Sequence, residues 1–321
     1  MRAIVFDKFG DPSVLRIGEV PSPPLVDGAI RIRVRAAGVN RADLLQREGH
    51  YPPPPGASTI LGLECAGEVA EIARGVNGWN VGDRAMALLP GGGYAEGVVV
   101  DAGSAMHIPD ALSFEEAGAV PEVFLTAFLN VFDLARAKRG ETLLAHGGGS
   151  GVGTAAITLG KLAGLRVVVT VGSDQKAQRC RQHGADDAIN YKTDDFAERA
   201  KGANVILDHI GASYLPRDLQ ALAVGGRVVI IGSMGGGGKI ELDVNSLLGK
   251  RQQIIGSTLR ARPNEEKAAI VSSFLARFGD DLNAGRIRPV VHRVFPLEQA
   301  AEAHREMAGD HFGKIVLRVS S

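Results

Sequence analysis

The sequence predicts an α/β protein in which a doubly wound parallel sheet accompanies a second, strand-rich domain. Three observations lead to this fold class: strands and helices alternate through the middle of the chain, those strands are almost entirely apolar, and a glycine-rich turn connects the first of them to a helix. With 321 residues the chain is long enough for two ordinary domains.

The alternation begins near Glu141. An apolar strand at Thr142–Ala145 precedes a helix at Ser150–Ala163 and a strand at Arg166–Val171. The same order then repeats, through Ser173–His183, Ala188–Asn190, a helix near Asp194–Ala200, Val205–Asp208, a helix near Tyr214–Ala221, and Arg227–Ile231. Strands that are apolar on both faces are typical of a parallel sheet covered by helices on both sides.

The two ends of the chain have a different pattern. Ala29–Ala37 alternates apolar residues with arginines, which indicates a half-exposed strand. Tyr51–Gly56 contains four prolines and is expected to be an extended loop. Short strands are also predicted at Met1–Asp7, Glu68–Ile72, Arg84–Leu88 and Glu96–Val100. After a helix around Pro263–Phe278, the segments Pro289–Phe295, Leu297–Met307 and Lys314–Val319 read as strand, helix and strand that could fold back on the first segment.

The overall composition argues against several classes of protein. Lys plus Arg (36) equal Asp plus Glu (36), so the whole chain offers no field that would attract nucleic acid or an anionic membrane. No apolar run approaches the roughly 20 residues that span a bilayer, and no signal-peptide pattern is present. Only Cys65 and Cys180 occur, and both are interpreted as packing residues, Cys65 with a weaker alternative as an oxidisable thiol. We therefore expect a cytoplasmic protein.

The glycine turn is the main functional signal. Gly149, Ser150, Gly151, Val152 and Gly153 follow an apolar strand and open a helix. Small residues allow the backbone to approach a pyrophosphate, and the helix N-terminus supplies free N–H groups and the positive end of a dipole. The alternative is a turn that needs glycine only for tight packing. The strand–turn–helix context favours a dinucleotide site.

The end of the next strand indicates which dinucleotide is bound. An NAD site usually has Asp or Glu there to bind the ribose diol, whereas this strand ends in Gly172 and Ser173. Lys176 follows in the next helix and Tyr191 follows the third strand. Hydroxyl, ammonium and phenol groups suit a 2′-phosphate, so the pattern predicts NADPH. Lys176 could instead be an ordinary surface lysine.

No metal site is predicted. The eight histidines form no short ligand spacing, and no cysteine cluster accompanies them. His209 follows the strand Val205–Asp208 and is expected to make a polar contact near the cofactor.

Several motifs resemble a known family. The runs Gly38–Asp43, Gly49–Gly56 and Leu61–Val69 resemble the zinc-independent, zeta-crystallin-like quinone oxidoreductases of the medium-chain dehydrogenase/reductase superfamily. Ala85–Gly93 and Pro121–Ala127 are similar to the subgroup that includes the tumour-suppressor-inducible quinone oxidoreductase, and Gly313–Leu317 also matches. The similarity covers essentially the whole chain.

The resemblance implies a GroES-like, partly β-barrel substrate domain from residues 1–120 and 284–321, a Rossmann domain from residues 121–283, and an active site between them. Zinc ligands of related enzymes would fall at Asn40, Leu63 and Glu122, of which Leu63 cannot bind metal. The resemblance places Asn40 and Thr126 at the nicotinamide, and it implies a homodimer through the Rossmann domains. The loop Gly232–Met234 and the segment Ser257–Leu259 would also line the nicotinamide pocket. Gly232, Met234 and Leu259 are the residues expected to contact the cofactor there.

The expected reaction is hydride transfer from NADPH to a quinone, whose delocalised hydroquinone anion needs no metal. Tyr51 is the candidate catalytic residue, either as proton donor or for orienting the acceptor; packing against the proline loop is an equal alternative. Other possible functions are reduction of an enone or enoyl-thioester, for which Arg260 and Arg262 could bind an acidic carrier, and a non-catalytic NADPH-binding protein, for example one that binds RNA. No basic stripe supports RNA binding.

Overall fold

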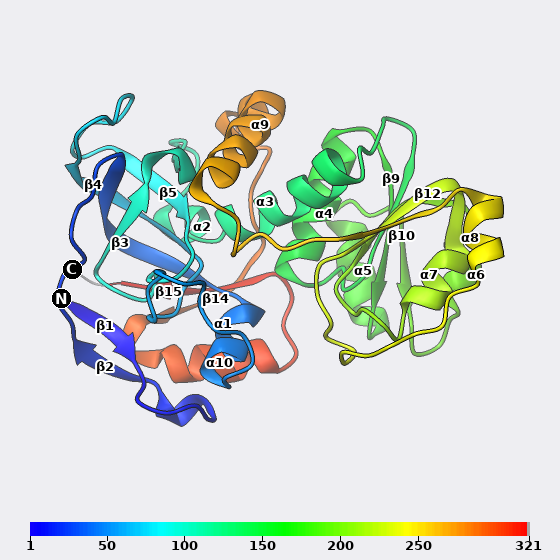
Figure 1. The fold of residues 1–321 in the computed structure, drawn as a ribbon, viewed down its shortest axis with the longest axis horizontal. Helices are drawn as coiled ribbons and strands as arrows, with labels where there is room; N and C mark the ends of the chain where they lie inside the picture. Colours follow the sequence, from blue (N-terminus) through cyan, green and yellow to red (C-terminus); the bar gives the residue numbers. More distant parts are fainter. Residues whose placement is uncertain (320–321) are drawn as a thin grey trace. The chain divides into compact units, whose positions relative to one another are not determined.

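The computed structural model describes residues 1–319 and consists of two compact units (Figure 1). The first unit contains residues 1–125 and 259–319, and the second contains Thr126–Thr258. The division falls within helix α3 (Pro121–Phe128), which continues into a π-helical turn at Leu129–Leu134.

The second unit is built on a six-stranded parallel sheet in the order β10-β9-β8-β11-β12-β13. Numbered from β8, this is the 3-2-1-4-5-6 order of a doubly wound dinucleotide-binding fold, so the predicted fold class is confirmed. The strands are β8 (Thr142–Ala145), β9 (Arg166–Val171), β10 (Asp187–Asn190), β11 (Ala203–Asp208), β12 (Leu222–Ile230) and β13 (Gln253–Gly256). Sequence analysis did not anticipate β13.

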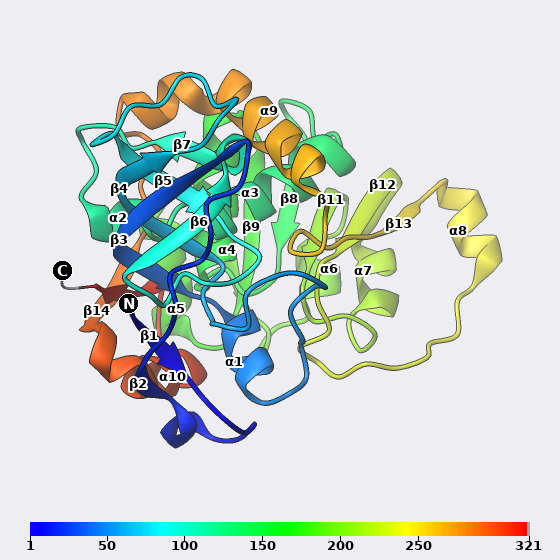
Figure 2. The same ribbon diagram turned by 60° about the vertical axis from the view of Figure 1, so that its left-hand side comes forward.

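Helices cover both faces of this sheet (Figure 1). On one face Leu144 and Val168 pack against Phe196 of α6 and Leu215 of α7. Because right-handed crossovers reverse direction where the strand order reverses, α4 and α5 lie on the opposite face. The helices are α4 (Gly151–Leu162), α5 (Asp174–Gln182), α6 (Phe196–Arg199), α7 (Leu215–Ala221) and α8 (Val244–Lys250). Figure 2 shows α8 beyond β13, at the edge of this unit.

The first unit contains a seven-stranded sheet, ordered β14-β15-β3-β4-β5-β7, with β6 also paired to β3. Strand β15 pairs antiparallel with β3, so the predicted return of the tail to the first segment is confirmed. A separate pair, β1 (Arg2–Val5) and β2 (Arg16–Glu19), completes the strands. The sheet strands are β3 (Ala29–Val39), β4 (Glu64–Ile72), β5 (Arg84–Leu88), β6 (Gly97–Asp101), β7 (Ala105–His107), β14 (Val291–Pro296) and β15 (Lys314–Arg318).

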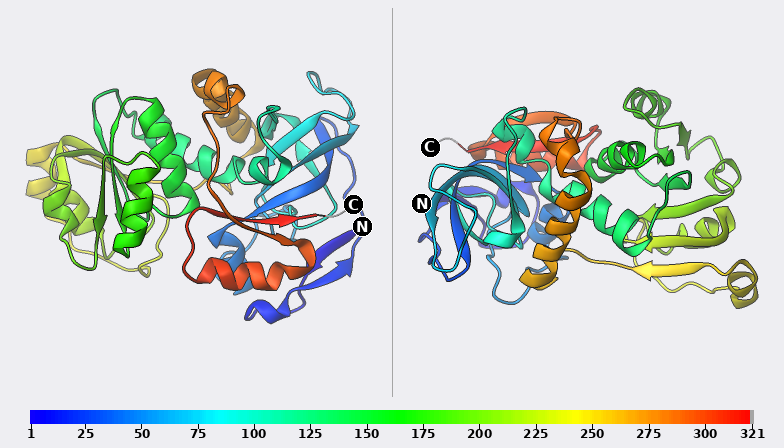
Figure 3. Two further views of the ribbon diagram at one scale, coloured as in Figure 1. Left: turned by 180° about the vertical axis from the view of Figure 1, so that it is seen from behind. Right: turned by 90° about the horizontal axis from the view of Figure 1, so that it is seen from above.

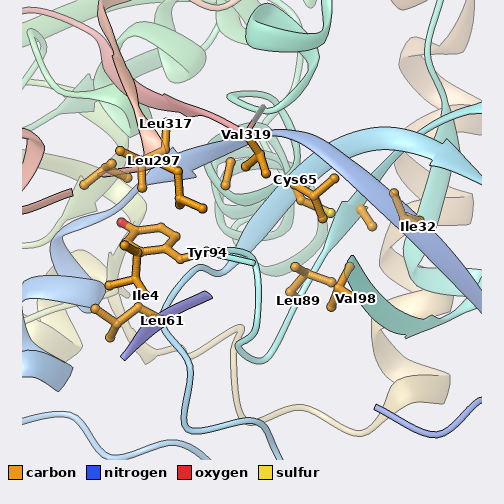
Figure 4. Close-up of a cluster of buried hydrophobic side chains, with 14 of the residues drawn as sticks. Ile4, Ile32, Leu61, Cys65, Leu89, Tyr94, Val98, Leu297, Leu317 and Val319 are labelled. Atoms are coloured by element: carbon orange, nitrogen blue, oxygen red, sulfur yellow. The ribbon is translucent and has the colours of Figure 1, made fainter. Parts of the chain in front are cut away.

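Apolar side chains from both ends of the chain form the core of the first unit (Figure 4). Ile4, Ile32 and Cys65 pack with Leu297 and Leu317. Cys65 is fully buried and burial raises the pKa of its thiol, so it is a packing residue rather than an oxidisable one. The helices are α1 (Arg41–Arg47), α2 (Phe114–Ala117), α9 (Asn264–Asn283) and α10 (Ala300–Ala308), with 3₁₀ turns at Pro12–Val14, Ala102–Ser104 and Leu297–Gln299. Figure 3 shows α10 beside the strands of the tail.

Helix α9 belongs to the first unit, whereas the sequence-based boundary at residue 283 assigned it to the dinucleotide domain. The physical reason is its close packing on the 3₁₀ turn Ala102–Ser104. A Cβ built on Gly103 would lie only 2.6 Å from the Cβ of Ala268, so the helix approaches this turn at backbone distance. Helical periodicity predicted α9 itself but carried no information about which sheet it covers.

Residues 51–56 form no helix or strand, as the four prolines predict. Within residues 1–319, no helix combines the length and apolar character needed to cross a membrane.

Candidate functional site

The glycine turn lies at the carboxyl end of β8, where the strand order reverses between β8 and β11. Doubly wound sheets bind ligands at this point. Ser150 caps α4, and its Oγ accepts a hydrogen bond from the backbone N–H of Gly153 at 3.0 Å. A Cβ on Gly153 would lie 2.3 Å from the carbonyl oxygen of Gly147, so only glycine allows the helix to begin this close to the turn. The 12-residue helix α4 therefore opens against a backbone cradle that suits a pyrophosphate.

Of the three residues predicted to bind the 2′-phosphate, Ser173 and Tyr191 follow the carboxyl ends of the neighbouring strands β9 and β10, and Lys176 lies in the first turn of α5. Ser173 caps α5, and its Oγ accepts a hydrogen bond from the backbone N–H of Lys176 at 3.3 Å. The ring of Tyr191 lies against Gly172, since a Cβ there would be 2.7 Å from the phenolic oxygen. The first acid of α5, Asp174, accepts a hydrogen bond from the side chain of Asn190 at 2.9 Å. The fold thus brings Ser173 and Tyr191 to one sheet edge.

Strand β11 positions the loop that contains Gly232 and Met234. The carbonyl oxygen of His209 accepts a hydrogen bond from the backbone N–H of Met234 at 3.0 Å. The imidazole of His209 itself lies against Gly147, because a Cβ there would be 2.5 Å from two of its ring atoms. Burial lowers the pKa of His209 to about 4, so the ring is neutral at pH 7. The polar residue expected here therefore packs against the glycine turn.

A buried network that sequence analysis missed lies at the base of this turn. His146 is the last residue before the glycines; its Nδ1 is 2.9 Å from Oγ1 of Thr170 and its Nε2 is 2.8 Å from a carboxylate oxygen of Asp218. Burial lowers the pKa of His146 to about 4 and raises that of Asp218 well above its ordinary value. Burial thus disfavours the charged form of both groups, which form a hydrogen-bonded pair beneath the turn. No short sequence spacing could have revealed it.

Asp208 joins His146 and Asp218 in the one group of described residues that is spaced closely enough to bind a metal ion. Its carboxylate oxygens instead accept hydrogen bonds from the backbone N–H groups of Ile210 and Gly211. These bonds hold the chain as it leaves β11. We therefore interpret these three residues as a hydrogen-bonded network that supports the turn.

The first unit contains a buried ion pair between Lys314 on β15 and Glu64 on β4, with the ammonium nitrogen 2.7 Å from Oε1. Lys314 also donates to Oδ1 of Asn40 at 2.6 Å and to the carbonyl oxygen of Val39 at 2.9 Å. The Asn40 amide donates in turn to Glu64 at 2.9 Å. Both ends of the Asn40 side chain are thus engaged within the first unit, and its predicted contact with nicotinamide stays a prediction.

Glu122 extends this network. Its backbone N–H donates to the second carboxylate oxygen of Glu64 at 2.9 Å, but its own carboxyl group forms no hydrogen bond with any residue of the described chain. Burial, and then the negative charge of Glu64, raise the pKa of Glu122 to about 8. The group is therefore largely protonated at pH 7.

The other predicted residues are placed as follows. Tyr51 is half-buried, and its ring lies under the guanidinium of Arg260, 5.2 Å from ring centroid to Cζ. Thr126 on α3 is buried in the second unit, and its carbonyl oxygen accepts a hydrogen bond from Asn130. Leu259 is buried in the first unit. Their roles at a cofactor stay predictions. Leu63, which follows the loop before β4, is also buried and has no metal-binding atom.

Comparisons with known proteins agree with this architecture. Residues 26–110 match the family "Alcohol dehydrogenase GroES-like domain", and residues 151–276 match the family "Zinc-binding dehydrogenase". The chain is 31% identical over 327 residues to the quinone oxidoreductase of Rattus norvegicus, covering 99% of this chain and 97% of that protein.

Two solved structures are similar over nearly the full length. One, an NAD-dependent alcohol dehydrogenase, is 33% identical, with a TM-score of 0.85 and 100% coverage of both chains. The other, a mycobacterial protein complexed with NADPH, is 29% identical, with a TM-score of 0.87 and coverage of 99% and 100%.

The fold and the glycine cradle define an oxidoreductase that uses a nicotinamide cofactor, built from a GroES-like unit and a dinucleotide-binding unit. The chain belongs to the quinone oxidoreductase family of the medium-chain dehydrogenase/reductase superfamily. The family expected from the sequence motifs is therefore confirmed.

The raised pKa of Glu122 predicts a measurable pH effect on stability. The folded state retains a proton on this carboxyl group between pH 4.5 and about 8, where the unfolded state has released it. Its contribution to stability is therefore complete below pH 4.5 and is lost as the pH rises to about 8. Glu122→Gln keeps the shape of the side chain but cannot become charged. Between pH 5 and pH 9, the free energy of unfolding of this variant should therefore rise by about 1–2 kcal/mol relative to that of the wild type. This value is reduced to allow for the partial exposure of the side chain.

Urea unfolding at pH 5, 7 and 9 measures this difference. Glu265→Gln, at an exposed position of the same unit, serves as the control and should show no such trend. A stability difference between Glu122→Gln and wild type that is the same at all three pH values would contradict the assignment.

Proposed function

We propose that this chain is an NADPH:quinone oxidoreductase that transfers hydride to a quinone-type acceptor without a metal. When bound, NADPH supplies the hydride, and the protein provides orientation and protection from water. The glycine turn at β8–α4 would hold the pyrophosphate through Gly149 to Gly153. A quinone fits this scheme because the hydroquinone anion is delocalised and requires no Lewis acid.

The preference for NADPH over NADH rests chiefly on the ends of β9 and β10. Ser173, Lys176 and Tyr191 offer a hydroxyl, an ammonium and a phenol, and β9 ends without the acid that would bind the ribose diol. Asp174, the nearest acid, already accepts a hydrogen bond from Asn190. These features favour a 2′-phosphate.

The second candidate function is reduction of an enoyl-thioester attached to an acidic carrier. Arg260 and Arg262 could have bound such a carrier, but both form other interactions in the structure. Arg260 is 3% exposed and donates to the carbonyl oxygens of Pro90 and Tyr51. Arg262 pairs with Glu266 at 2.7 Å. Because both arginines already bind other groups of the protein, neither is well placed to bind the phosphate of a carrier. A small quinone or enone is therefore favoured as the acceptor. The net charge of zero gives no support to a role in RNA binding.

Steady-state oxidation of NADPH against ortho- and para-quinones, enones and enoyl-CoA tests the proposed reaction. We expect kcat/KM for at least one quinone to exceed the values for enones and enoyl-CoA by tenfold or more. NADPH binding without turnover of any quinone would refute it.

Substitution of Lys176 tests the cofactor preference. Lys176→Ala should weaken NADPH binding by roughly tenfold, the loss of one charge-assisted contact to phosphate, and leave NADH binding unchanged. Fluorescence titration with both reduced cofactors measures this. Lys201→Ala, at an exposed turn of the same unit, is the matched control. Equal weakening of NADPH and NADH by Lys176→Ala would argue against the 2′-phosphate site.

We also propose a homodimer formed through the second unit. Within residues 1–319, strand β13 lies at the end of the sheet order and pairs on one side only, with β12. Leu242, Val244 and Leu248 precede it and are 38%, 59% and 68% exposed. An edge strand beside exposed apolar side chains is typical of a surface that pairs with a second copy.

Val244→Asp together with Leu248→Asp should convert the dimer to a monomer in size-exclusion chromatography with light scattering. Val26→Asp changes a valine of nearly equal exposure, 57%, in the first unit and should have no effect. A wild-type monomer, or a dimer that survives the double substitution, would contradict this arrangement.

We also propose that the protein is located in the cytoplasm. Its two buried free thiols, Cys65 and Cys180, suit that reducing compartment.

A further inference from the structure

Four polar side chains of the first unit, Tyr51, Glu122, Arg260 and Lys267, are linked by electrostatic interactions, and we call this group the acid–base cluster. Arg260 is its fixed centre. Its guanidinium donates to Oε1 of Gln46 at 2.6 Å, to the carbonyl oxygen of Pro90 at 2.8 Å and to that of Tyr51 at 3.3 Å. Three of its five N–H groups are used in this way, and two remain. The guanidinium also lies over the ring of Tyr51.

The other three members each end in a polar group without a partner. Within residues 1–319, the Tyr51 hydroxyl, the Glu122 carboxyl and the Lys267 ammonium form no hydrogen bond or ion pair. None of them is among the fully enclosed polar atoms that lack a partner, so all three reach accessible surface. Polar groups that act on one another electrostatically and yet have no hydrogen-bond partner are typical of a ligand site.

Lys267 is the unusual member. It is 3% exposed, yet a buried ammonium is normally paired. The helix α9 holds it in place: its backbone N–H donates to the carbonyl oxygen of Pro263, and the adjacent Ala268 packs against Gly103. Its neighbouring charges are those of Glu122 and Arg260. Glu122 is largely protonated at pH 7, so little of its charge remains to offset Lys267, whereas the carboxylate charge that acts most strongly on Arg260 is that of Asp43.

We propose that Lys267 binds the oxygen of the acceptor that becomes negative and gives it a proton, while Arg260 acts as the second, permanent cation. This inference rests on the proposed quinone reductase function and adds to it the proton donor. The acceptor class is a small molecule whose reduction produces an oxyanion, a hydroquinone anion above all.

The chemical step balances. The acceptor takes up a hydride, two electrons and one hydrogen nucleus, from the dihydronicotinamide, which is oxidised. The acceptor becomes a monoanion, an N–H bond of the Lys267 ammonium breaks, and an O–H bond forms on the anionic oxygen. Lys267 is left as a neutral amine and regains a proton from water. Arg260 cannot perform this step, because a guanidinium does not deprotonate in proteins.

The surroundings make Tyr51 a weaker acid and Lys267 a stronger acid than either group is in water. Burial, and then the charge of Glu122, raise the pKa of Tyr51 above its ordinary value of 10, which makes its hydroxyl a weaker acid. Burial lowers the pKa of Lys267, with Arg260 acting in the same direction and Glu122 opposing it. A lowered pKa makes the ammonium a better acid near neutral pH. Tyr51 is left to orient the acceptor.

Binding of 4-nitrophenol, an unreactive phenol whose absorbance distinguishes its two protonation states, tests the anion site without turnover. The NADP⁺-loaded wild type should bind the phenolate form. Lys267→Met should weaken phenolate binding by about tenfold or more, whereas Lys267→Arg retains the cation and should bind within about threefold of wild type. Lys8→Met, at an exposed position of the same unit, should match wild type. An unchanged melting temperature and unchanged NADPH binding verify that each variant is folded.

Turnover separates proton donation from binding. With a quinone that the wild type reduces, both Lys267→Met and Lys267→Arg should lower kcat by about 10²-fold, the usual contribution of a positioned general acid. Lys267→Arg should do so without raising KM. Small primary ammonium ions added to a Lys267→Ala variant should restore part of the rate.

Each outcome decides a different proposal. Wild-type phenolate binding by Lys267→Met, or full turnover by Lys267→Arg, overturns the role of Lys267. A loss of turnover in Glu122→Gln or Tyr51→Phe, with none in the Lys267 variants, assigns the proton to another group and also overturns it. If phenolate binding depends on Lys267 but the protein reduces no quinone, the anion site is supported and the proposed reaction is refuted.

Discussion

The buried ion pair between Lys314 and Glu64 is the interaction on which the first unit depends. It joins the C-terminal strand β15 to β4, and through Asn40 and the backbone of Glu122 it reaches the start of α1 and of α3. The approach is so close that a Cβ on Gly38 would lie 2.2 Å from the Glu64 carboxylate. A buried pair of this kind is strongly destabilised by removal of one partner, because the other charge is then left uncompensated.

The same pair also acts on the acid–base cluster. Burial, and then the negative charge of Glu64, raise the pKa of Glu122, while Lys314 opposes this shift; a protonated Glu122 does not neutralise Lys267. In the second unit the corresponding constraint is close backbone packing. Gly153 lets α4 begin against Gly147, and the hydrogen-bonded pair of His146 and Asp218, whose charged forms burial disfavours, supports that turn from below.

Much of the fold could be predicted from local patterns. The alternating apolar strands and helices from Thr142 to Ile231 predicted the parallel sheet, because each element carries its own periodicity. Strand β13 was missed, since Gln253–Gly256 is short and only partly buried at the sheet edge. Helix α9 was predicted but placed with the wrong sheet, because periodicity identifies an apolar face and not the surface that covers it.

The sequence by itself determined the glycine turn, the absence of an acid at the end of β9 and the positions of Ser173, Lys176 and Tyr191 near strand ends, because these features depend on local sequence patterns. Only the tertiary structure decided which charges meet. Lys314 and Asn40 are 274 residues apart, and Arg260 and Gln46 are 214 apart. Burial and neighbouring charge govern the protonation of Glu122 and Lys267, and both arise only when distant segments pack together.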